Sequence, residues 1–410
     1  IPAEPEKNPG YSDEEIEDLI VENNFIPIAT AEELNNVRNA TIETYGKGTQ
    51  WEGLYEGGLD KKYIQVANID LSGYSEEEGW APIGNYSSNF TGSFDGNGYS
   101  ITGLKINRPE TEHIGLFGYT DKATIRNVAL EDINVTGGDS TGGLVGFADS
   151  STTVTNSYAT GEVTGGSSTG GLVGYVFSST ITNSYATGEV TGTHATGGLV
   201  GYANGSTIEN SYATGKVTGE GNCTGGLVGY AYNSTEITNS YATGKVTGTG
   251  ERTGGLVGYA YNSTEISNSY ATGEVTGTHA TGGLVGWAEG SSISNSYATG
   301  SVSGGSYYTG GLVGAAEYST KITKITNSYA TGSVTGTNYT GGLVGAASGS
   351  TEITNSYWNT ETTGQSTSAE GGSGKSTEEM MQKATYPSSW DFDEVWKIDE
   401  GNSYPTLRQP

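Results

Sequence analysis

Short apolar runs, separated by Gly, Ser, Thr and Asn, recur along most of this 410-residue chain. The most regular run is the Leu-Val pair of the phrase T-G-G-L-V-G, whose leucines lie 27 to 31 residues apart. These leucines are Leu144, Leu172, Leu199, Leu227, Leu256, Leu284, Leu312 and Leu343, and the count starts from Leu116 in a degenerate copy, I-G-L-F-G. A fixed period in this range is typical of a solenoid, in which each unit buries its apolar residues only by stacking on its neighbours.

The composition of the repeat predicts an all-β solenoid rather than a helical one. Gly recurs at several positions of every unit, and each would cost an α-helix roughly 1 kcal/mol relative to Ala. The Val-, Ile- and Tyr-containing runs bounded by Gly and Asn indicate short strands instead. We therefore expect a parallel β-helix with about 28 residues and about three strands per coil. In one coil, the strands would begin near Leu172, Ile181 and Val190.

A degenerate copy of the repeat predicts which side chains face outward. Aligning Ile125–Leu130 with Val154–Ala159 places Val128 and Leu130 at the positions of Ser157 and Ala159. If those positions are core, the repeated Tyr faces outward, because side chains alternate along a strand. One outward column would then contain Tyr158, Tyr185, Tyr212, Tyr241, Tyr270, Tyr297, Tyr329 and Tyr357. A second would contain Phe147, Tyr175, Tyr202, Tyr230, Tyr259 and Trp287, and end in Ala315 and Ala346.

These columns have two interpretations. Stacked rings stabilise the fold, and exposed rings can also form a face that stacks on sugars or docks a subunit. The Asn residues of N-S-Y-A-T-G predict a ladder at a bend, because Asn tolerates left-handed backbone and its amide can bond the next coil. They are Asn156, Asn183, Asn210, Asn239, Asn268, Asn295, Asn327 and Asn355. A recurring Thr, from Thr141 to Thr340, would fill another bend or, as a remote alternative, form an ice-binding face.

Irregular sequence at both ends of the repeat predicts caps, which a solenoid needs to cover its open strand edges. The predicted segments are an acidic tail with a capping helix (1–50), irregular first coils (51–136), the regular β-helix (137–358), and a linker with a short helix and a Trp-rich cap (359–410). Capping boxes begin at Ser12, Thr30 and Ser376 and predict small helices. We expect the third helix to continue to about Ala384, and the tail to fill a recess left by Ala315 and Ala346.

Several phrases of the chain resemble a known family. They are P-I-A-T-A-E-E-L-N-N-V, I-D-L-S-G, W-A-P-I-G, F-T-G-S-F-D-G-N-G-Y-S-I-T-G-L and the serial G-G-L-V-G with N-S-Y-A-T-G-x-V. Over about residues 25–410, the sequence looks like the Glug-motif repeat proteins of the pectin-lyase-like right-handed β-helix group. That resemblance implies the fold and a place on or outside bacterial or archaeal cells. It implies no activity, because the motif occurs in adhesin-like proteins and as an accessory part of surface peptidases.

Charge and composition narrow the partners and the compartment. The chain has 46 Asp and Glu against 18 Lys and Arg, a net charge of −28, which argues against nucleic acid and anionic membranes as partners. Its only cysteine, Cys223, precludes a disulfide framework, and no apolar run is long enough to predict a membrane span. The first residue is Ile1 rather than Met. We read this as a processed leader and expect a secreted, extracellular or cell-surface protein.

Motifs for catalysis or metal binding are sparse. Acidic residues of the regular coils are scattered over different loop positions, without the basic partner that a polysaccharide-cleaving site needs. His194 and His279 share one loop position but stand three coils apart, about 14 Å by stacking. Asp95-Gly96-Asn97-Gly98 is better explained as a turn than as a calcium loop. We therefore predict no enzyme and no cofactor, and calcium has no supporting motif.

Nine N-x-S/T sequons offer N-glycosylation sites if the host glycosylates the protein. They are Asn39, Asn85, Asn89, Asn134, Asn204, Asn222, Asn233, Asn262 and Asn338. Variable loops between V-T-G and T-G-G-L are either recognition elements or unconstrained turns.

The favoured function is a non-catalytic structural protein of a prokaryotic cell surface. It would be a self-assembling surface-layer, sheath or filament subunit, partnered by copies of itself, or an adhesin stalk. The alternatives are a glycan-binding module that uses the aromatic columns and, less favoured, a polysaccharide-active enzyme.

Overall fold

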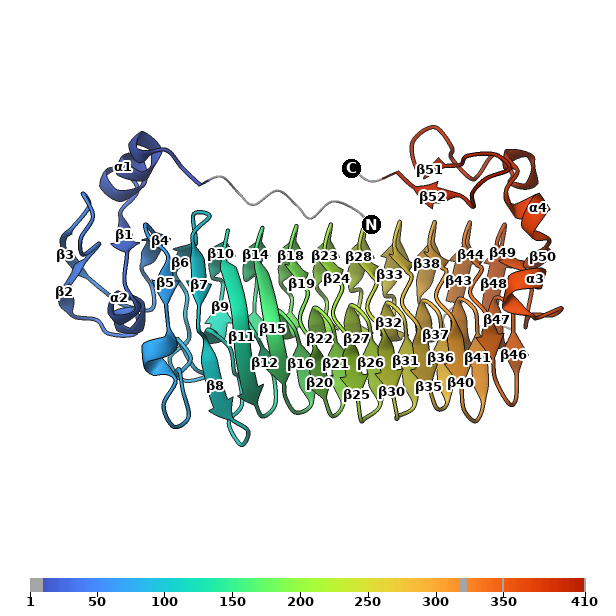
Figure 1. The fold of residues 1–410 in the computed structure, drawn as a ribbon, viewed down its shortest axis with the longest axis horizontal. Coiled ribbons are helices and arrows are strands. Elements are labelled where there is room, and N and C mark those ends of the chain that lie inside the picture. Colours follow the sequence, from blue (N-terminus) through green and yellow to red (C-terminus); the bar gives the residue numbers. More distant parts are fainter. Residues whose placement is uncertain (1–9, 318–322, 349, 409–410) are drawn as a thin grey trace.

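Short parallel strands stack coil upon coil into one rod, with small caps at its two ends (Figure 1). The computed structural model describes residues 10–317, 323–348 and 350–408. The predicted parallel β-helix is confirmed. Strand pairs join residues one coil apart, such as Val154 with Ile181 and Ile181 with Ile208.

Each regular coil contains five short strands, so the expectation of three was wrong. In one coil these are β16 (Ser168–Gly170), β17 (Val173–Phe177), β18 (Thr180–Thr182), β19 (Tyr185–Ala186) and β20 (Val190–Gly192). The extra breaks fall at Asn and at the paired Gly. Asn183 has φ 50°, a left-handed conformation that interrupts a strand.

The corresponding strands of successive coils form parallel sheets. The first face contains β1 (Phe25–Ile28), β4 (Lys62–Gln65), β6 (Ser93–Asp95), β10 (Thr124–Arg126), β14 (Thr153–Thr155), β18, β23 (Thr207–Glu209), β28 (Glu236–Thr238), β33 (Glu265–Ser267), β38 (Ser292–Ser294), β43 (Thr323–Thr326) and β48 (Thr351–Thr354). The second contains β9 (Phe117–Asp121), β13 (Val145–Asp149), β17, β22 (Val200–Asn204), β27 (Val228–Tyr232), β32 (Val257–Tyr261), β37 (Val285–Glu289), β42 (Val313–Ala316) and β47 (Val344–Ala347). A short third sheet contains β12 (Thr141–Gly142), β16, β21 (Ala195–Gly197), β26 (Cys223–Gly225), β31 (Arg252–Gly254), β36 (Ala280–Gly282), β41 (Tyr308–Gly310) and β46 (Thr340–Gly341).

The remaining face has two ladders that meet in the long strands β11 (Ala129–Gly137) and β15 (Tyr158–Thr164). One ladder carries the repeated Tyr: β5 (Ile69–Asp70), β7 (Ser100–Thr102), β19, β24 (Tyr212–Ala213), β29 (Tyr241–Ala242), β34 (Tyr270–Ala271), β39 (Tyr297–Ala298), β44 (Tyr329–Ala330), β49 (Tyr357–Asn359) and β50 (Ser373–Lys375). The other carries the repeated Val: β8 (Lys105–Arg108), β20, β25 (Val217–Gly219), β30 (Val246–Gly248), β35 (Val275–Gly277), β40 (Val302–Gly304) and β45 (Val334–Thr335).

The predicted apolar ladders form the core. Leu172, Ile181 and Val190 are each 0% exposed, as are their counterparts in most coils. The paired Gly lets neighbouring coils approach closely. A Cβ on Gly226 would lie 2.0 Å from the carbonyl oxygen of Gly255, so any larger residue there would push the coils apart.

Polar ladders hold the bends. All eight predicted Asn residues have φ between 46° and 50°, and the Asn156 amide donates to Asn127 Oδ1 at 3.3 Å. The Ser that follows each Asn is buried, and we did not predict its role. The recurring Thr is also buried, with Thr196 and Thr281 both 0% exposed. An ice-binding Thr face is therefore wrong, because these side chains fill a bend.

The N-terminal cap covers the first coils with α1 (Asp13–Val21), α2 (Ala31–Asn36), the η1 turn (Ser72–Tyr74) and the hairpin of β2 (Ile42–Tyr45) and β3 (Gly53–Glu56). Ser12 forms the predicted capping box with Glu15. Asp95, expected in a turn, is 0% exposed and accepts hydrogen bonds from Arg126 Nε at 2.6 Å and Asn127 Nδ2 at 2.9 Å. Its carboxylate thus joins two coils.

The C-terminal segment departs from the prediction in three ways. Residues 359–375, expected to be a linker, form α3 (Thr360–Thr363) and β50 and cross the last coil, where the amide of Gly342 donates to Thr367. The next helix, α4 (Thr377–Met380), ends earlier than expected and is followed by the η2 turn (Lys383–Thr385). The tail, with β51 (Trp396–Lys397) and β52 (Thr406–Leu407), folds back along the side of the rod onto the Tyr ladder rather than over Ala315 and Ala346 (Figure 1). The stacked Tyr rings offer a larger apolar surface than Ala315 and Ala346 do. The tail therefore buries more apolar area by packing on the Tyr ladder.

Candidate functional site

The repeated tyrosines form a continuous stack on the outside of the coils, as the degenerate copy predicted. Ala129 pairs with Tyr158 and Leu130 with Ala159. From Tyr158 to Tyr329, successive ring centroids are 4.7 to 5.1 Å apart and the planes differ by 2° to 8°. This spacing between rings equals the spacing between neighbouring strands of a sheet. The pairing of the backbones therefore determines the distance at which the rings stack.

Only the N-terminal end of this stack is open as a binding face. Tyr158 and Tyr185 are partly exposed, whereas Tyr297 and Tyr329 are 7% and 1% exposed. The tail covers the latter two, because Trp396 packs 6.2 and 6.1 Å from their ring centroids. Tyr329 also donates its hydroxyl hydrogen bond to Pro405 O at 2.6 Å. Tyr212, Tyr241 and Tyr270 are likewise only 7%, 8% and 9% exposed, so the predicted open face does not extend over the residues from Tyr212 to Tyr329.

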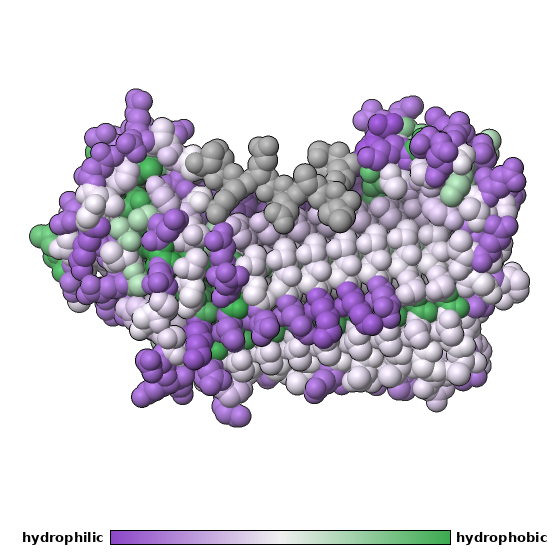
Figure 2. Space-filling model, in the orientation of Figure 1, coloured by the Kyte–Doolittle hydropathy of each residue, from purple (hydrophilic) through white to green (hydrophobic). Residues whose placement is uncertain are grey.

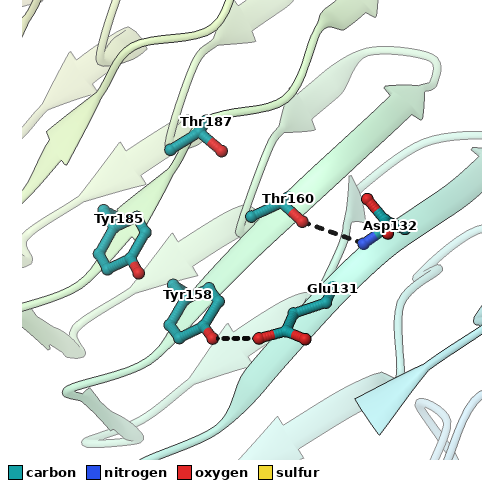
Figure 3. Close-up of a pocket in the computed structure, with 6 residues that line it drawn as sticks. All are labelled: Glu131, Asp132, Tyr158, Thr160, Tyr185 and Thr187. Atoms are coloured by element: carbon teal, nitrogen blue, oxygen red, sulfur yellow. Dashed lines mark hydrogen bonds between the residues drawn. The ribbon is translucent and has the colours of Figure 1, made fainter. Parts of the chain in front are cut away.

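A hollow of about 310 Å³ lies at the open end of the stack (Figure 3). It is lined by Glu131, Asp132, Tyr158, Thr160, Tyr185 and Thr187. Tyr158 donates to Glu131 Oε1 at 2.7 Å, and the amide of Asp132 donates to Thr160 Oγ1 at 3.0 Å. The lining offers carboxylates, hydroxyls and two tyrosine rings, and includes no Lys, Arg or His. Such a set can accept and donate hydrogen bonds to polar groups of a ligand.

Burial keeps the phenols of the stack neutral. Desolvation raises the pKa of Tyr241 to about 12. It also raises the pKa of Tyr270, Tyr297 and Tyr329. An ionised phenol inside the stack would lose its hydration, so these rings serve packing rather than acid–base chemistry.

The second aromatic column follows the second face and is only partly exposed. Phe147, Tyr175 and Tyr202 meet edge to face at 4.4 and 4.6 Å, and Tyr230 and Tyr259 stack at 4.9 Å. The column ends at Trp287, and its next positions, Ala315 and Ala346, are buried. The last ring of the column, Trp287, therefore lies beside the start of β41, where it contacts Tyr308.

The sequons differ in access. Asn39, Asn85, Asn134, Asn222 and Asn338 are exposed, and Asn89, Asn204, Asn233 and Asn262 are partly buried. Among the latter, the Asn233 amide donates to Asn204 Oδ1 at 3.2 Å, and Asn262 donates to Asn233. A glycan would have to displace this amide ladder at Asn233 and Asn262. Glycosylation of the exposed sequons stays a prediction.

Within the described residues, no group of three or more His, Cys, Asp or Glu is arranged to hold a metal ion. His194 and His279 precede β21 and β36, between which two strands lie. Across residues 10–317, 323–348 and 350–408, no helix is long and apolar enough to cross a membrane.

The repeat itself identifies the family. The model of the Glug family, described as "The GLUG motif", matches seven consecutive segments: 137–164, 165–191, 192–218, 220–247, 249–276, 277–303 and 305–335. The chain thus carries seven Glug motifs between residues 137 and 335. Each Glug segment begins in the loop before one T-G-G-L-V-G and ends after the next N-S-Y-A-T-G, so one motif corresponds to one coil.

Two curated relatives share part of this Glug sequence. A Gly-rich membrane protein of Evansella cellulosilytica is 38% identical over 112 residues, 27% of this chain and 11% of that protein. Halomucin of Haloquadratum walsbyi is 37% identical over 92 residues, 20% of this chain and 1% of that protein. The Glug chain thus aligns with only a small part of either relative.

Two solved structures are distantly similar. A Bacteroides ovatus protein, provisionally described as an immunoglobulin A1 protease, gives a TM-score of 0.46 at 20% identity over 94% of this chain and 92% of its own. The catalytic domain of a GH87 α-1,3-glucanase in complex with nigerose gives 0.25 at 12% identity over 80% and 57%. At these scores, neither likeness informs the function of the Glug chain.

Proposed function

We propose that this chain is a stiff, non-catalytic spacer in a protein displayed on a prokaryotic cell surface, a stalk that holds a neighbouring segment away from the envelope. The observation that carries the proposal is the continuity of the coils. The Leu, Ile, Val, Ser, Asn and Tyr ladders run from coil to coil along one axis. The repeated positions thus serve the stacking of coil on coil, and the length of the rod grows in proportion to the number of coils.

The covered ends favour a stalk over a filament subunit. At one end, α2 of the N-terminal cap packs on the apolar core, where the side chains of Leu34 and Val37 are 0% exposed. At the other, Ser368 Oγ accepts from the amide of Val344 on the last strand of the second face, and Ala369 donates to its carbonyl. Strand edges that are covered in this way cannot extend into another copy.

Surface placement is supported by composition and by the relatives. The net charge of −28 suits a solvated exterior, and Figure 2 shows strongly hydrophilic side chains gathered at both ends of the rod. The matched relatives are named as a membrane protein and as halomucin. Display on the outside of the cell would account for both the acidic composition and the similarity to these relatives.

A whole-coil deletion tests the spacer role. Removing residues 199–255 joins Gly198 to Leu256 and keeps the T-G-G-L-V-G phrase intact. We expect the shortened chain to fold and its rod to lose roughly 10 Å, two strand spacings, as measured by small-angle X-ray scattering. As a control, removing residues 199–212 deletes half a coil and should prevent folding, because the ladders fall out of register.

Surface display is tested on intact cells of the source organism. Antibodies raised against the rod should label the cells, and added protease should remove the label. Absence of labelling would refute the surface location. Equal folding of the half-coil and whole-coil deletions would refute the additive rod.

A further inference from the structure

A shallow hollow of about 340 Å³ opens where the variable loops of three consecutive coils meet the end of the second aromatic column. Its lining residues, here called the loop cluster, are Glu251, Arg252, His279, Trp287, Tyr307 and Tyr308. Most of them lie just before or at the start of β31, β36 and β41, which are neighbours in the short third sheet. The hollow therefore runs along the rod, across coils.

Aromatic rings of the loop cluster are presented to solvent. His279 and Tyr307 stack at 5.4 Å with an angle of 18° between their planes, and Trp287 meets Tyr308 edge to face at 6.1 Å. Tyr307 is 47% exposed. Tyr339, on the next coil, lies 5.5 Å from Tyr308 and is 67% exposed. Grouped exposed rings of this kind mark a contact surface.

The coil does not require these rings. The loop positions of Glu251, His279 and Tyr307 are occupied in earlier coils by Asp139, Ser167, His194 and Asn222, and those coils pair in the same register. Tyr339 also has φ 44°, a conformation that a bulky residue adopts only at a cost in free energy. Stability of the fold therefore does not explain why the rings gather here.

The charges of the loop cluster select a neutral ligand. Arg252 Cζ lies 4.3 Å from the Tyr259 ring centroid and 5.2 Å from that of Trp287. Its guanidinium already occupies these ring faces, so a cationic ligand would meet repulsion. Arg252 is paired with Glu251 at 2.8 Å, and Glu289 accepts from Tyr259. With the positive charge neutralised and an acidic chain around it, the hollow does not attract an anion either.

We propose that the loop cluster binds a neutral pyranose chain. The exposed ring of Tyr307 packs against the C–H face of a sugar, and the Glu251–Arg252 pair accepts from and donates to its hydroxyls. The volume of the hollow lies in the range of small-ligand sites. This binding goes beyond the spacer role and does not depend on it.

Binding of the full chain to defined oligosaccharides tests the proposal. The probes are the neutral hexamers of cellulose, amylose, mannan, xylan and N-acetylated chitin, with polygalacturonate and chitosan as charged comparisons. We expect at least one neutral hexamer to bind. The double variant Tyr307→Ala/Tyr339→Ala should weaken it at least about tenfold, with circular dichroism and Tm unchanged. Tyr86→Ala removes a ring that is 74% exposed on the first coils and should leave affinity unchanged.

Fluorescence places the ligand in the hollow. Tryptophan emission should change on titration with the bound hexamer, and Trp287→Phe should abolish that change. The proposal is overturned if no neutral hexamer binds, if only charged polymers bind, if the double variant binds as the natural chain does, or if the emission change survives Trp287→Phe.

Discussion

Buried hydroxyls join adjacent coils at the Ser of each N-S-Y phrase. The amide of Ser211 donates to Ser240 Oγ at 3.2 Å, and Ser240 donates in turn to Thr238 O at 2.7 Å. The same pattern continues at Ser269 and Ser296. Each hydroxyl thus satisfies two buried backbone groups in different coils, which an apolar side chain of similar size cannot do.

Replacing one such Ser should destabilise the rod. Ser240→Ala leaves the buried amide of Ser211 without its partner, while the carbonyl of Thr238 still accepts from the amide of Asn210 at 3.1 Å. We expect the free energy of unfolding to fall by about 1–3 kcal/mol. Urea titration measures the change. Ser301→Ala, at an exposed position, is the matched control and should change it little. An equal effect of the two variants would contradict the ladder.

The ladders that could be predicted from the sequence are those in which the residue's own hydrophobicity or turn preference determines its place in the coil. The Leu, Ile and Val positions follow from hydrophobic spacing, and the left-handed Asn follows from the turn preference of that residue. The role of the Ser was missed because, in a Ser-rich chain, a Ser that will be buried looks the same in sequence as one at the surface. Only the course of the coil shows that this Ser faces the interior. The sequence offered the variable loops as possible recognition elements, but it did not predict that their side chains gather in the loop cluster. Arg252, His279 and Tyr307 come from separate repeats, and only stacking brings them together.

At the scale of elements, the C-terminal cap acts as a clamp on the side of the rod. Trp390 and Trp396 stack at 4.5 Å, and Trp390 lies 5.9 Å from the ring of Tyr357. The sequence predicted a Trp-rich cap that folds back but placed it in the wrong recess. The missing rings at Ala315 and Ala346 suggested a gap, whereas Tyr308 lies at the end of that column, 6.1 Å from Trp287.

Removing one ring of the clamp should release it while the coils stay folded. Trp396 is 0% exposed, and Trp396→Ala should cost about 3–5 kcal/mol of docking. We expect amide hydrogen exchange to accelerate in β51 and β52 and to stay slow in β24 and β29. Trp51→Ala, in the opposite cap, should leave β51 and β52 unchanged. Loss of protection throughout the rod would show that the clamp and the coils unfold together.

At the scale of the whole molecule, the tyrosine stack makes stability sensitive to alkali. Burial raises the pKa of Tyr241 to about 12, above the value near 10 of an unfolded chain. Because the folded state favours the neutral phenol, its contribution is complete below about pH 10 and is lost as pH rises toward 12. The midpoint of urea unfolding, followed with tyrosinate absorbance, should fall across this window.

Variants at two tyrosines separate this effect from general alkaline denaturation. Tyr241→Phe removes one buried titrating group and should make the fall less steep. Tyr86→Phe, at an exposed ring, should leave the slope as it is. The stack would not be the cause if both variants retained the slope of the natural chain.

The matching upper and lower edges of every coil have a consequence for heredity. Because a coil such as residues 199–226 presents its neighbours with the same ladders as the next, recombination between near-identical gene segments can add or drop whole turns without creating a new type of interface. The length of the rod can therefore change between descendants in discrete steps while both caps are inherited intact, and the loop cluster is kept wherever the exchange spares the coils of residues 249–335.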